Sequence, residues 1–479
     1  MRHPLLLLAL VSLAQATAPL AVAAPKARVV KAATAATPES IAIGLAARLA
    51  DTSENGLAYG LVRDLTTEIG PRLAGTDAEK RAADWAMARF KALGIDTVWT
   101  EPFTIKGWQR GIERAEITAP SPQPLVITAL GNTPATPPEG IEAPIVLFPT
   151  YKAFIDAPAD TVRGRIVVVT EQTVRLQDGG GYGAAGALRR NGPAEASRRG
   201  AVAYLLRSLG THEHRFPHTG STVFPEDVTP LPAAALSPPD AEQLERLVAK
   251  GEPVRLRLTL SPQSLGPVSS QNVIAEIRGR EKPDEIILIG AHLDSWDLGT
   301  GAIDDGAGVA IVMAAAKMIR DLPTPPRRTV RIVLFGAEEP GLLGARAYVA
   351  AHKAALDKHV LATEADFGQG PVYRFSTNVA DPAHPALERI RASLRPLGII
   401  PGTNRAHGGP DIGPMQALGV PVVNLELDGT DYFDTHHTPD DVLNRIEPAR
   451  ISQTSAAYAI YTYLAAELEG DYRPTAAPQ

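Results

Sequence analysis

Apolar residues recur at helical spacing in three segments near the start of the chain, roughly 38–50, 55–69 and 76–94. Each segment predicts an amphipathic helix. In the third, Thr76 stands where an N-cap is expected and Gly94 ends the pattern. The strand-like segment DTVWTEPFTIKGW follows it.

From about 120 to 262 the pattern changes to short apolar runs between Pro- and Gly-rich turns. The runs are PLVITAL, APIVLF, GRIVVVT, AVAYLL and VRLRLTL. Such runs predict a β-rich inserted domain, which resembles a protease-associated domain. Within it, the Gly-rich segment LQDGGGYGAAG has no following Gly-Lys-Ser/Thr, so we expect a flexible loop and not a phosphate-binding loop.

From about 270 onward, predicted strands alternate with predicted helices. NVIAEIRG, EIILIGAH, TVRIVLFGAEE and VLATEADFG have the apolar pattern of buried strands, and a helix near 449–468 closes the chain. This alternation predicts an α/β fold, a three-layer sandwich with a mostly parallel central sheet. In such sheets chemistry gathers beyond the carboxyl ends of the strands.

The length of 479 residues indicates more than one domain. We expect the N-terminal part of the main domain at 24–120, the inserted domain at 121–262, the rest of the main domain at 263–470 and a tail at 471–479. The net charge of −6 argues against a nucleic-acid partner. The absence of cysteine excludes disulfides, thiolate ligands and a cysteine nucleophile.

The first 23 residues have the pattern of a secretory signal peptide. Arg2 and His3 precede an apolar stretch from Leu5 to Leu13, and the small residues up to Ala23 mark the cleavage site. The apolar stretch is too short to cross a membrane. We therefore expect a secreted or periplasmic protein with no membrane span.

Acids and histidines follow the predicted strands of the last part of the chain. They are His292 and Asp294, Asp304 and Asp305, Glu338 and Glu339, Glu364 and Asp366, and His436 and His437. Singly, each has an ordinary explanation; Asp304 and Asp305, for example, could form a helix N-cap. Their shared position favours divalent metal ions, with zinc as the natural choice for imidazole and carboxylate ligands. Two metals that share a carboxylate would activate a bridging water and polarise a carbonyl together.

The segments GAHLDSW, GAIDDGAG, FGAEEPG, TEADFG and HHTPDD together resemble the co-catalytic di-zinc exopeptidases. This family includes the bacterial leucyl aminopeptidases and the glutamate carboxypeptidase II group. The likeness is greatest to the plasma glutamate carboxypeptidase (carboxypeptidase Q) group and its bacterial relatives, and it extends to GLVRDLTTEIGPRLAGT near the N-terminal end. It implies two Zn²⁺ per chain, with Co²⁺ as a possible substitute, and a homodimer.

The resemblance also implies a role for each residue. His292 and Asp366 would bind one zinc, Glu339 and His437 the other, Asp304 would bridge them, Glu338 would be the general base, and Asp294 would accept a hydrogen bond from the ring of His292. His437 is preferred to His436 because the family pattern reads His-Thr followed by an acid; His436 is the fallback. A second ligand role for Glu364 stays open.

Three further residues are candidates for substrate contact. Asp411 lies in GGPDIGPMQALGVPVVNL, which resembles the stretch framing the substrate end of the pocket. In THEHRFPHTG, His218 belongs to a histidine-rich segment that either reaches over the site or is plain surface loop; an independent metal site there is disfavoured because no acid has useful spacing. His436, if it is not a ligand, is the third candidate.

These observations predict a di-zinc metallo-exopeptidase that cleaves peptides or dipeptides with a free N-terminus. The direction of cleavage stays open, because the most similar group is named for carboxypeptidase activity. Two alternatives remain. One is an N-acyl amidohydrolase or glutaminyl cyclase on the same fold, and the other is a non-catalytic, receptor-like homologue, which the complete set of ligands disfavours.

Overall fold

The computed structural model describes residues 36–473. The expected signal peptide and residues 474–479 of the expected tail lie outside the described residues. Residues 37–473 form one compact unit. Within residues 36–473, no helix is both long enough and apolar enough to cross a membrane.

The first of two eight-stranded sheets has the order β1-β10-β12-β11-β13-β16-β14-β15. Its strands are β1 Val98–Gln109, β10 Gln263–Ile277, β11 Lys282–His292, β12 Arg328–Phe335, β13 His359–Glu364, β14 Val372–Asn378, β15 Ile400–Pro401 and β16 Val422–Leu427. The four neighbours β12, β11, β13 and β16 run parallel, while β1 and β10 are antiparallel at one edge. This arrangement confirms the predicted fold class.

The central strands are buried on both faces, which explains their nearly continuous apolar sequences. Successive side chains of β11 enter different clusters. Ile287 and Ile289 pack with the helices of one face, and Leu288 packs with the helices of the other. The register pairs His292 with Phe335 and Gly290 with Glu364, so the carboxyl ends of three strands lie at the same edge.

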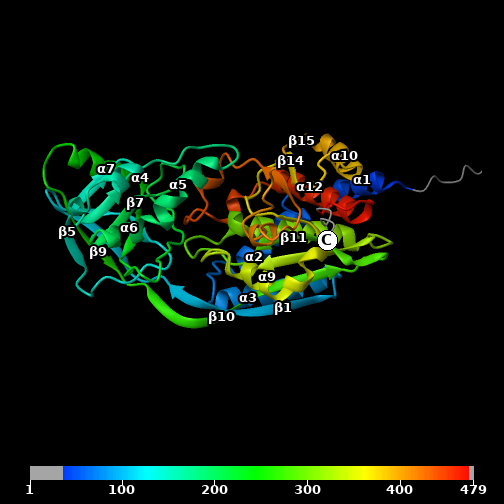
Figure 1. Ribbon diagram of the computed structural model, residues 1–479, viewed down its shortest axis with the longest axis horizontal. Helices are drawn as coiled ribbons and strands as arrows, with labels where there is room; N and C mark the ends of the chain where they lie inside the picture. The colour runs from blue at the N-terminus through cyan, green and yellow to red at the C-terminus, as the bar shows by residue number, and fades with distance from the viewer. Residues whose placement is uncertain (1–35, 474–479) are drawn as a thin grey trace, which may run out of the picture. The chain divides into compact units, whose positions relative to one another are not determined.

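Helices cover both faces of this sheet. Those of the larger cluster are α1 Pro38–Arg48, α2 Leu57–Glu68, α3 Asp77–Ala92, α8 Ala307–Arg320, α10 Pro385–Leu394 and α12 Pro448–Glu467; α9 Leu343–His352 and α11 Gly413–Gln416 pack in the other cluster. The side chain of Thr76 caps α3, as predicted. Near the two ends of the described chain, α1 packs against α12 (Figure 1).

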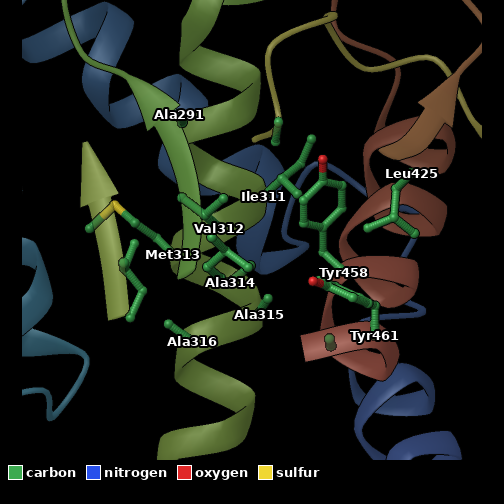
Figure 2. Packing of buried hydrophobic residues seen from close by; sticks show 14 of the residues in the cluster. Ala291, Ile311, Val312, Met313, Ala314, Ala315, Ala316, Leu425, Tyr458 and Tyr461 are labelled. Atoms are coloured by element: carbon green, nitrogen blue, oxygen red, sulfur yellow. The ribbon is translucent and has the colours of Figure 1, made fainter. Parts of the chain in front are cut away.

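The packing of α8 brings the sheet close to α12. Figure 2 shows the run from Ile311 to Ala316 of α8 near the strand with Ala291 and near Tyr458 of α12. Three successive alanines, 314–316, are fully buried and leave room for the close approach. The hydroxyl of Tyr458 then donates to the carbonyl of Glu364 at 2.6 Å and holds the end of β13.

The second sheet has the order β3-β2-β9-β5-β6-β7-β8-β4 and lies between β1 and β10 in sequence. Its strands are β2 Glu113–Ala119, β3 Gln123–Leu125, β4 Ile127–Ala129, β5 Ile141–Phe148, β6 Ile166–Val169, β7 Ala203–Arg207, β8 Ala233–Leu236 and β9 Arg255–Leu260. We call residues 113–260 the inserted module. Its sheet begins before residue 121, where the sequence placed the insertion; the domain bounds as a set stay a prediction.

The inserted module also contains helices that its apolar runs did not indicate. They are α4 Tyr151–Asp156, α5 Gly180–Arg190, α6 Gly192–Arg198 and α7 Pro238–Val248. The expectation of a flexible loop at LQDGGGYGAAG was wrong, because α5 begins at Gly180 within it. Tyr182 stacks on Phe433 with ring centroids 4.2 Å apart, and this tertiary contact anchors a segment whose glycines disfavour a helix.

Candidate metal centre

The strand ends bring the predicted ligands together in a buried cluster. His292 is the last residue of β11, Glu338 and Glu339 follow the end of β12, and Asp366 follows β13. His437 comes from the turn before α12. All lie at the carboxyl edge of the first sheet, where chemistry was expected.

Asp304 lies between two groups of donors. Its Oδ1 is 3.0 Å from Nε2 of His292, and that same nitrogen is 3.6 Å from Oδ1 of Asp366. Its Oδ2 is 3.1 Å from Nε2 of His437, which lies 3.0 Å from Oε2 of Glu339. Within each group the donor atoms lie within 4.8 Å of one another. Asp304 therefore offers one oxygen to each of two adjacent positions.

The donor set fits divalent cations. Oδ2 of Asp304 and Oε1 of Glu339 are buried without a hydrogen-bond partner. Within the described chain, the ion-pair partners of these two carboxylates are histidines alone. Buried carboxylates that lack a lysine or arginine partner need another positive charge, and nitrogen and oxygen donors at these separations suit zinc.

The loop that carries Asp304 is held by two other carboxylates. Asp305 accepts the N–H groups of His292 and Gly308, each at 3.0 Å, so the helix-capping explanation applies to Asp305 and not to Asp304. Asp441 accepts the N–H of Asp304 at 3.2 Å. Burial, together with the charge of Asp304, raises the pKa of Asp441 to about 7. The side chain of Asp304 is left free to point into the cluster.

Arg72 supplies a buried positive charge that sequence reasoning missed. Its guanidinium donates to the carbonyl groups of Leu293 at 2.5 Å, Thr300 at 2.8 Å and Gly301 at 2.9 Å. Burial lowers its pKa, and the charge of Asp441 opposes that effect. Arg72 thus joins the loops on either side of the site. Its only signal in the sequence was its place in the resembling segment GPRLAGT.

Asp294 accepts the expected hydrogen bond from the ring of His292 with its main-chain oxygen and not with its carboxylate. Nδ1 of His292 lies 3.0 Å from the main-chain oxygen of Asp294 but 3.7 Å from its carboxylate. The carboxylate instead accepts the N–H groups of Glu338 at 3.0 Å and Glu339 at 3.3 Å. The turn after β11 brings the main-chain carbonyl of Asp294 to the ring of His292. The carboxylate of Asp294 is then free to hold the main chain of Glu338 and Glu339.

The cluster perturbs its own ionisation. Burial raises the pKa of Glu338 well above its ordinary value; the charge of His292 opposes this and that of Glu339 adds to it. Although burial lowers it, the carboxylates of Glu339 and Asp304 raise the pKa of His437 to about 9. Without cations, Glu338 therefore tends to hold a proton and His437 to stay charged.

The structure places His436 and His218 beside these ligands. Nε2 of His436 is 3.3 Å from Oδ2 of Asp304, but His436 does not join the donor group that contains Glu339. Nε2 of His218 is 2.9 Å from Nδ1 of His436. The inserted module therefore reaches the turn that carries His436, and the role of each histidine in substrate binding stays a prediction.

Asp411 and Glu364 lie next to each other near the first donor group. The main-chain N–H of Asp411 donates to Oε2 of Glu364 at 2.8 Å, and both oxygens of the Asp411 carboxyl are buried without a partner. Burial, with the charge of Asp366, raises the pKa of Glu364 to about 8. His212 and His214 line a separate cavity of about 510 Å³ and do not reach the donor groups.

Comparison with known proteins agrees with this geometry. The model of the family described as Peptidase family M28 matches residues 272–462. Carboxypeptidase Q of Bos taurus is 33% identical over 412 residues, which cover 86% of each chain.

Solved structures show the same fold. The chain matches the crystal structure of a peptidase M28 precursor from Shewanella amazonensis with a TM-score of 0.89 and 47% identity, covering 92% of this chain and 99% of that one. The zinc aminopeptidase BSAP from Bacillus subtilis matches with a TM-score of 0.63 and 22% identity, covering 86% and 95%. The second likeness concerns the fold alone.

Proposed function

The chain belongs to peptidase family M28, and from this premise we propose that it is a di-zinc exopeptidase acting on peptides or dipeptides with a free N-terminus. The observation that carries the proposal is the position of Asp304. Its two carboxylate oxygens lie 3.0 Å from Nε2 of His292 and 3.1 Å from Nε2 of His437. A carboxylate so placed between two donor groups is suited to bridge two cations.

The chain's own residues would divide into two ligand sets. His292 and Asp366 would hold one zinc, Glu339 and His437 the other, and Asp304 both. Zinc ions bound there would lower the pKa of water and polarise the carbonyl group of the substrate. The relatives support zinc, since one neighbouring structure is named a zinc aminopeptidase.

Glu338 is the residue suited to move the proton. A carboxylate oxygen of Glu338 lies within 4.8 Å of donor atoms of both His292 and Glu339, so it reaches both sides of the site. Its main chain is fixed by Asp294. In the proposed reaction Glu338 takes a proton from the attacking water and gives it to the leaving amine.

Two unpaired carboxyl groups support a substrate with a free amine. Glu364 and Asp411 lie near the first donor group, and neither has a lysine or arginine partner among residues 36–473. Burial raises the pKa of both groups, and a nearby ammonium group would favour their ionised forms, whereas a C-terminal carboxylate would oppose them, so the pair favours a free amine. The first 23 residues support export from the cytoplasm, and the resemblance supports a homodimer.

A panel of substrates tests the proposal. The metal-replete protein is incubated with free dipeptides, the same dipeptides with a blocked N-terminus, and longer peptides, and the products are identified by mass. We expect hydrolysis of free dipeptides and stepwise loss of N-terminal residues from longer ones. Cleavage of blocked substrates at the same rate, or release of C-terminal residues, would contradict the proposed direction.

A further inference from the structure

His437 is held from outside the first sheet by Thr219 of the inserted module. The N–H of Thr219 donates to the carbonyl of His437 at 3.0 Å, and Nδ1 of the His437 ring lies 3.2 Å from the carbonyl oxygen of Thr219. One residue therefore contacts both the main chain and the ring of His437. The contact is long-range, since 218 positions separate the two residues.

Which atom donates the hydrogen bond between the His437 ring and Thr219 follows from the role of His437 as a metal ligand. Nε2 of His437 faces Asp304 and Glu339, so a bound cation would take its lone pair. The proton must then lie on Nδ1, which donates to the carbonyl of Thr219. A carbonyl partner of this kind fixes the tautomer and orientation of a metal-binding histidine and raises its basicity.

The main-chain conformation of His437 also depends on its contact with Thr219. Its φ angle is 58°, in the left-handed region that residues with a side chain rarely adopt. Such conformations persist only where the surroundings impose them. The hydrogen bond from Thr219 to the carbonyl of His437 is one contact that can impose it.

Arg189 holds the carbonyl of Thr219 in place. Its Nη1 donates to that carbonyl at 3.0 Å and to the hydroxyl of Tyr182 at 2.7 Å, and the residue is only 6% exposed. The same Nη1 lies 3.3 Å from Nδ1 of His437, and because both nitrogens carry protons, each donates to the carbonyl oxygen of Thr219 between them. A Cβ at Gly220 would lie 1.8 Å from the same nitrogen, so the guanidinium fills the space beside a glycine with φ of 134°. The space beside Gly220 is therefore occupied by the side chain of Arg189 and leaves no room for a side chain at position 220.

We propose that the inserted module completes the second metal position, with Thr219 fixing His437 as a ligand and Arg189 acting as the positioning residue for Thr219. The inference rests on the proposed function, because it requires two metal positions. The first position differs, since the ring of His292 is held by the carbonyl of Asp294 within the first-sheet part of the chain. Disturbing Arg189 should therefore affect one zinc and spare the other.

Zinc titration of the full chain tests this asymmetry. Metal-free protein is titrated with Zn²⁺ against a competing chelator, which gives the affinity of each equivalent. In Arg189→Met and Arg189→Lys we expect the affinity for the zinc at the second metal position to fall by about 10- to 100-fold. The affinity for the other zinc should not change. Arg190→Met is the matched control, because Arg190 is the exposed neighbour on α5, and it should leave both equivalents unchanged.

The two substitutions at position 189 separate geometry from charge. If Arg189 acts only as a nearby positive charge, Arg189→Met should tighten zinc binding and Arg189→Lys should leave it unchanged; either result would overturn the proposal. Tyr182→Phe is a milder variant that removes one partner of Arg189 and keeps its charge. It should weaken the second equivalent less, and equal loss of both equivalents in it would also overturn the proposal.

The outcome is distinct from that of the proposed function. If the unsubstituted chain binds fewer than two zinc ions, the proposed function fails. If it binds two and the Arg189 variants do the same with equal affinity, only the role of the inserted module fails.

Discussion

The carboxylate of Asp294 accepts the main-chain N–H of Glu338 at 3.0 Å, so one acid positions the main chain of another without touching its side chain. It also accepts the N–H of Glu339, whose side chain faces His437. Carboxylate oxygens of Glu338 and Glu339 lie within 4.8 Å of each other and of a ring nitrogen of His292, so both acids enter the same cluster. Asp294 is thus the common support of both.

Replacing Asp294 should disturb catalysis more than metal binding. Asp294→Asn keeps the main-chain carbonyl that holds the ring of His292, but its amide offers one acceptor oxygen where two N–H groups need partners. We expect a loss of about 10-fold or more in kcat with two zinc ions retained. Had the ring been held by the carboxylate, the first zinc would be lost; metal analysis of the purified variant distinguishes the two.

Glu338→Gln should abolish turnover while both zinc ions stay bound. The substitution keeps size and removes the proton acceptor, and loss of a general base typically costs about 10²- to 10⁴-fold in rate. The measurements are kcat on a free dipeptide and zinc content of the same sample. Near-normal kcat with a full zinc complement would remove Glu338 from the mechanism.

The two adjacent histidines provide a matched pair of substitutions. His437 lies in a donor group with Asp304 and Glu339, whereas His436 groups only with His437 and His218, without a carboxylate. The His437→Phe variant should therefore bind one zinc ion, and the His436→Phe variant should bind two. Any effect of His436→Phe should appear only in kcat or KM. The reverse stoichiometry would make the fallback residue the ligand.

Much of this site could be predicted from the sequence because buried parallel strands can be recognised as apolar runs. Once the ends of β11, β12 and β13 are located, the residues after them must share one edge of the sheet. Arg72 and Thr219 could not be found in this way. Their partners lie more than 200 positions distant in the chain, and their contacts depend on how separate parts pack.

The Gly-rich segment before Arg189 shows a second limit. Four glycines within 179–183 oppose a helix locally, yet α5 forms because Tyr182 packs on Phe433 and Arg189 is buried beside His437. The same packing places a segment without a recognisable motif beside the candidate metal centre. Local propensity was overridden by tertiary contacts.

Arg72 should matter for stability as well as for the site. Arg72→Met removes the donor for three buried carbonyl groups and leaves nearby carboxylates without a buried positive charge. We expect a loss of about 3–5 kcal/mol in the free energy of unfolding, measured by urea denaturation of the zinc-loaded protein. Arg63→Met, on the exposed side of α2, is the control and should cost less than about 1 kcal/mol.

Zinc should stabilise the protein more at pH 9 than at pH 6. Without metal, the pKa of His437 is raised from 6.5 to about 9 by Glu339 and Asp304, so it stabilises the fold fully below pH 6.5 and that contribution is lost as the pH rises through 9. The shift corresponds to about 3 kcal/mol. Asp441 acts in the same direction at lower pH, because a carboxyl whose pKa is raised to about 7 destabilises the ionised fold as the pH rises from about 4 to 7.

In the zinc-loaded protein, Nε2 of His437 would bind the cation in place of a proton and the carboxylates would be balanced, so this decline should be absent. The measurement is the melting temperature of chelator-treated and zinc-loaded protein at several pH values between 6 and 9. The difference between the two should widen with pH, and His437→Phe should flatten the decline of the metal-free protein. Parallel curves for the two forms would show that His437 is not charged in the metal-free site.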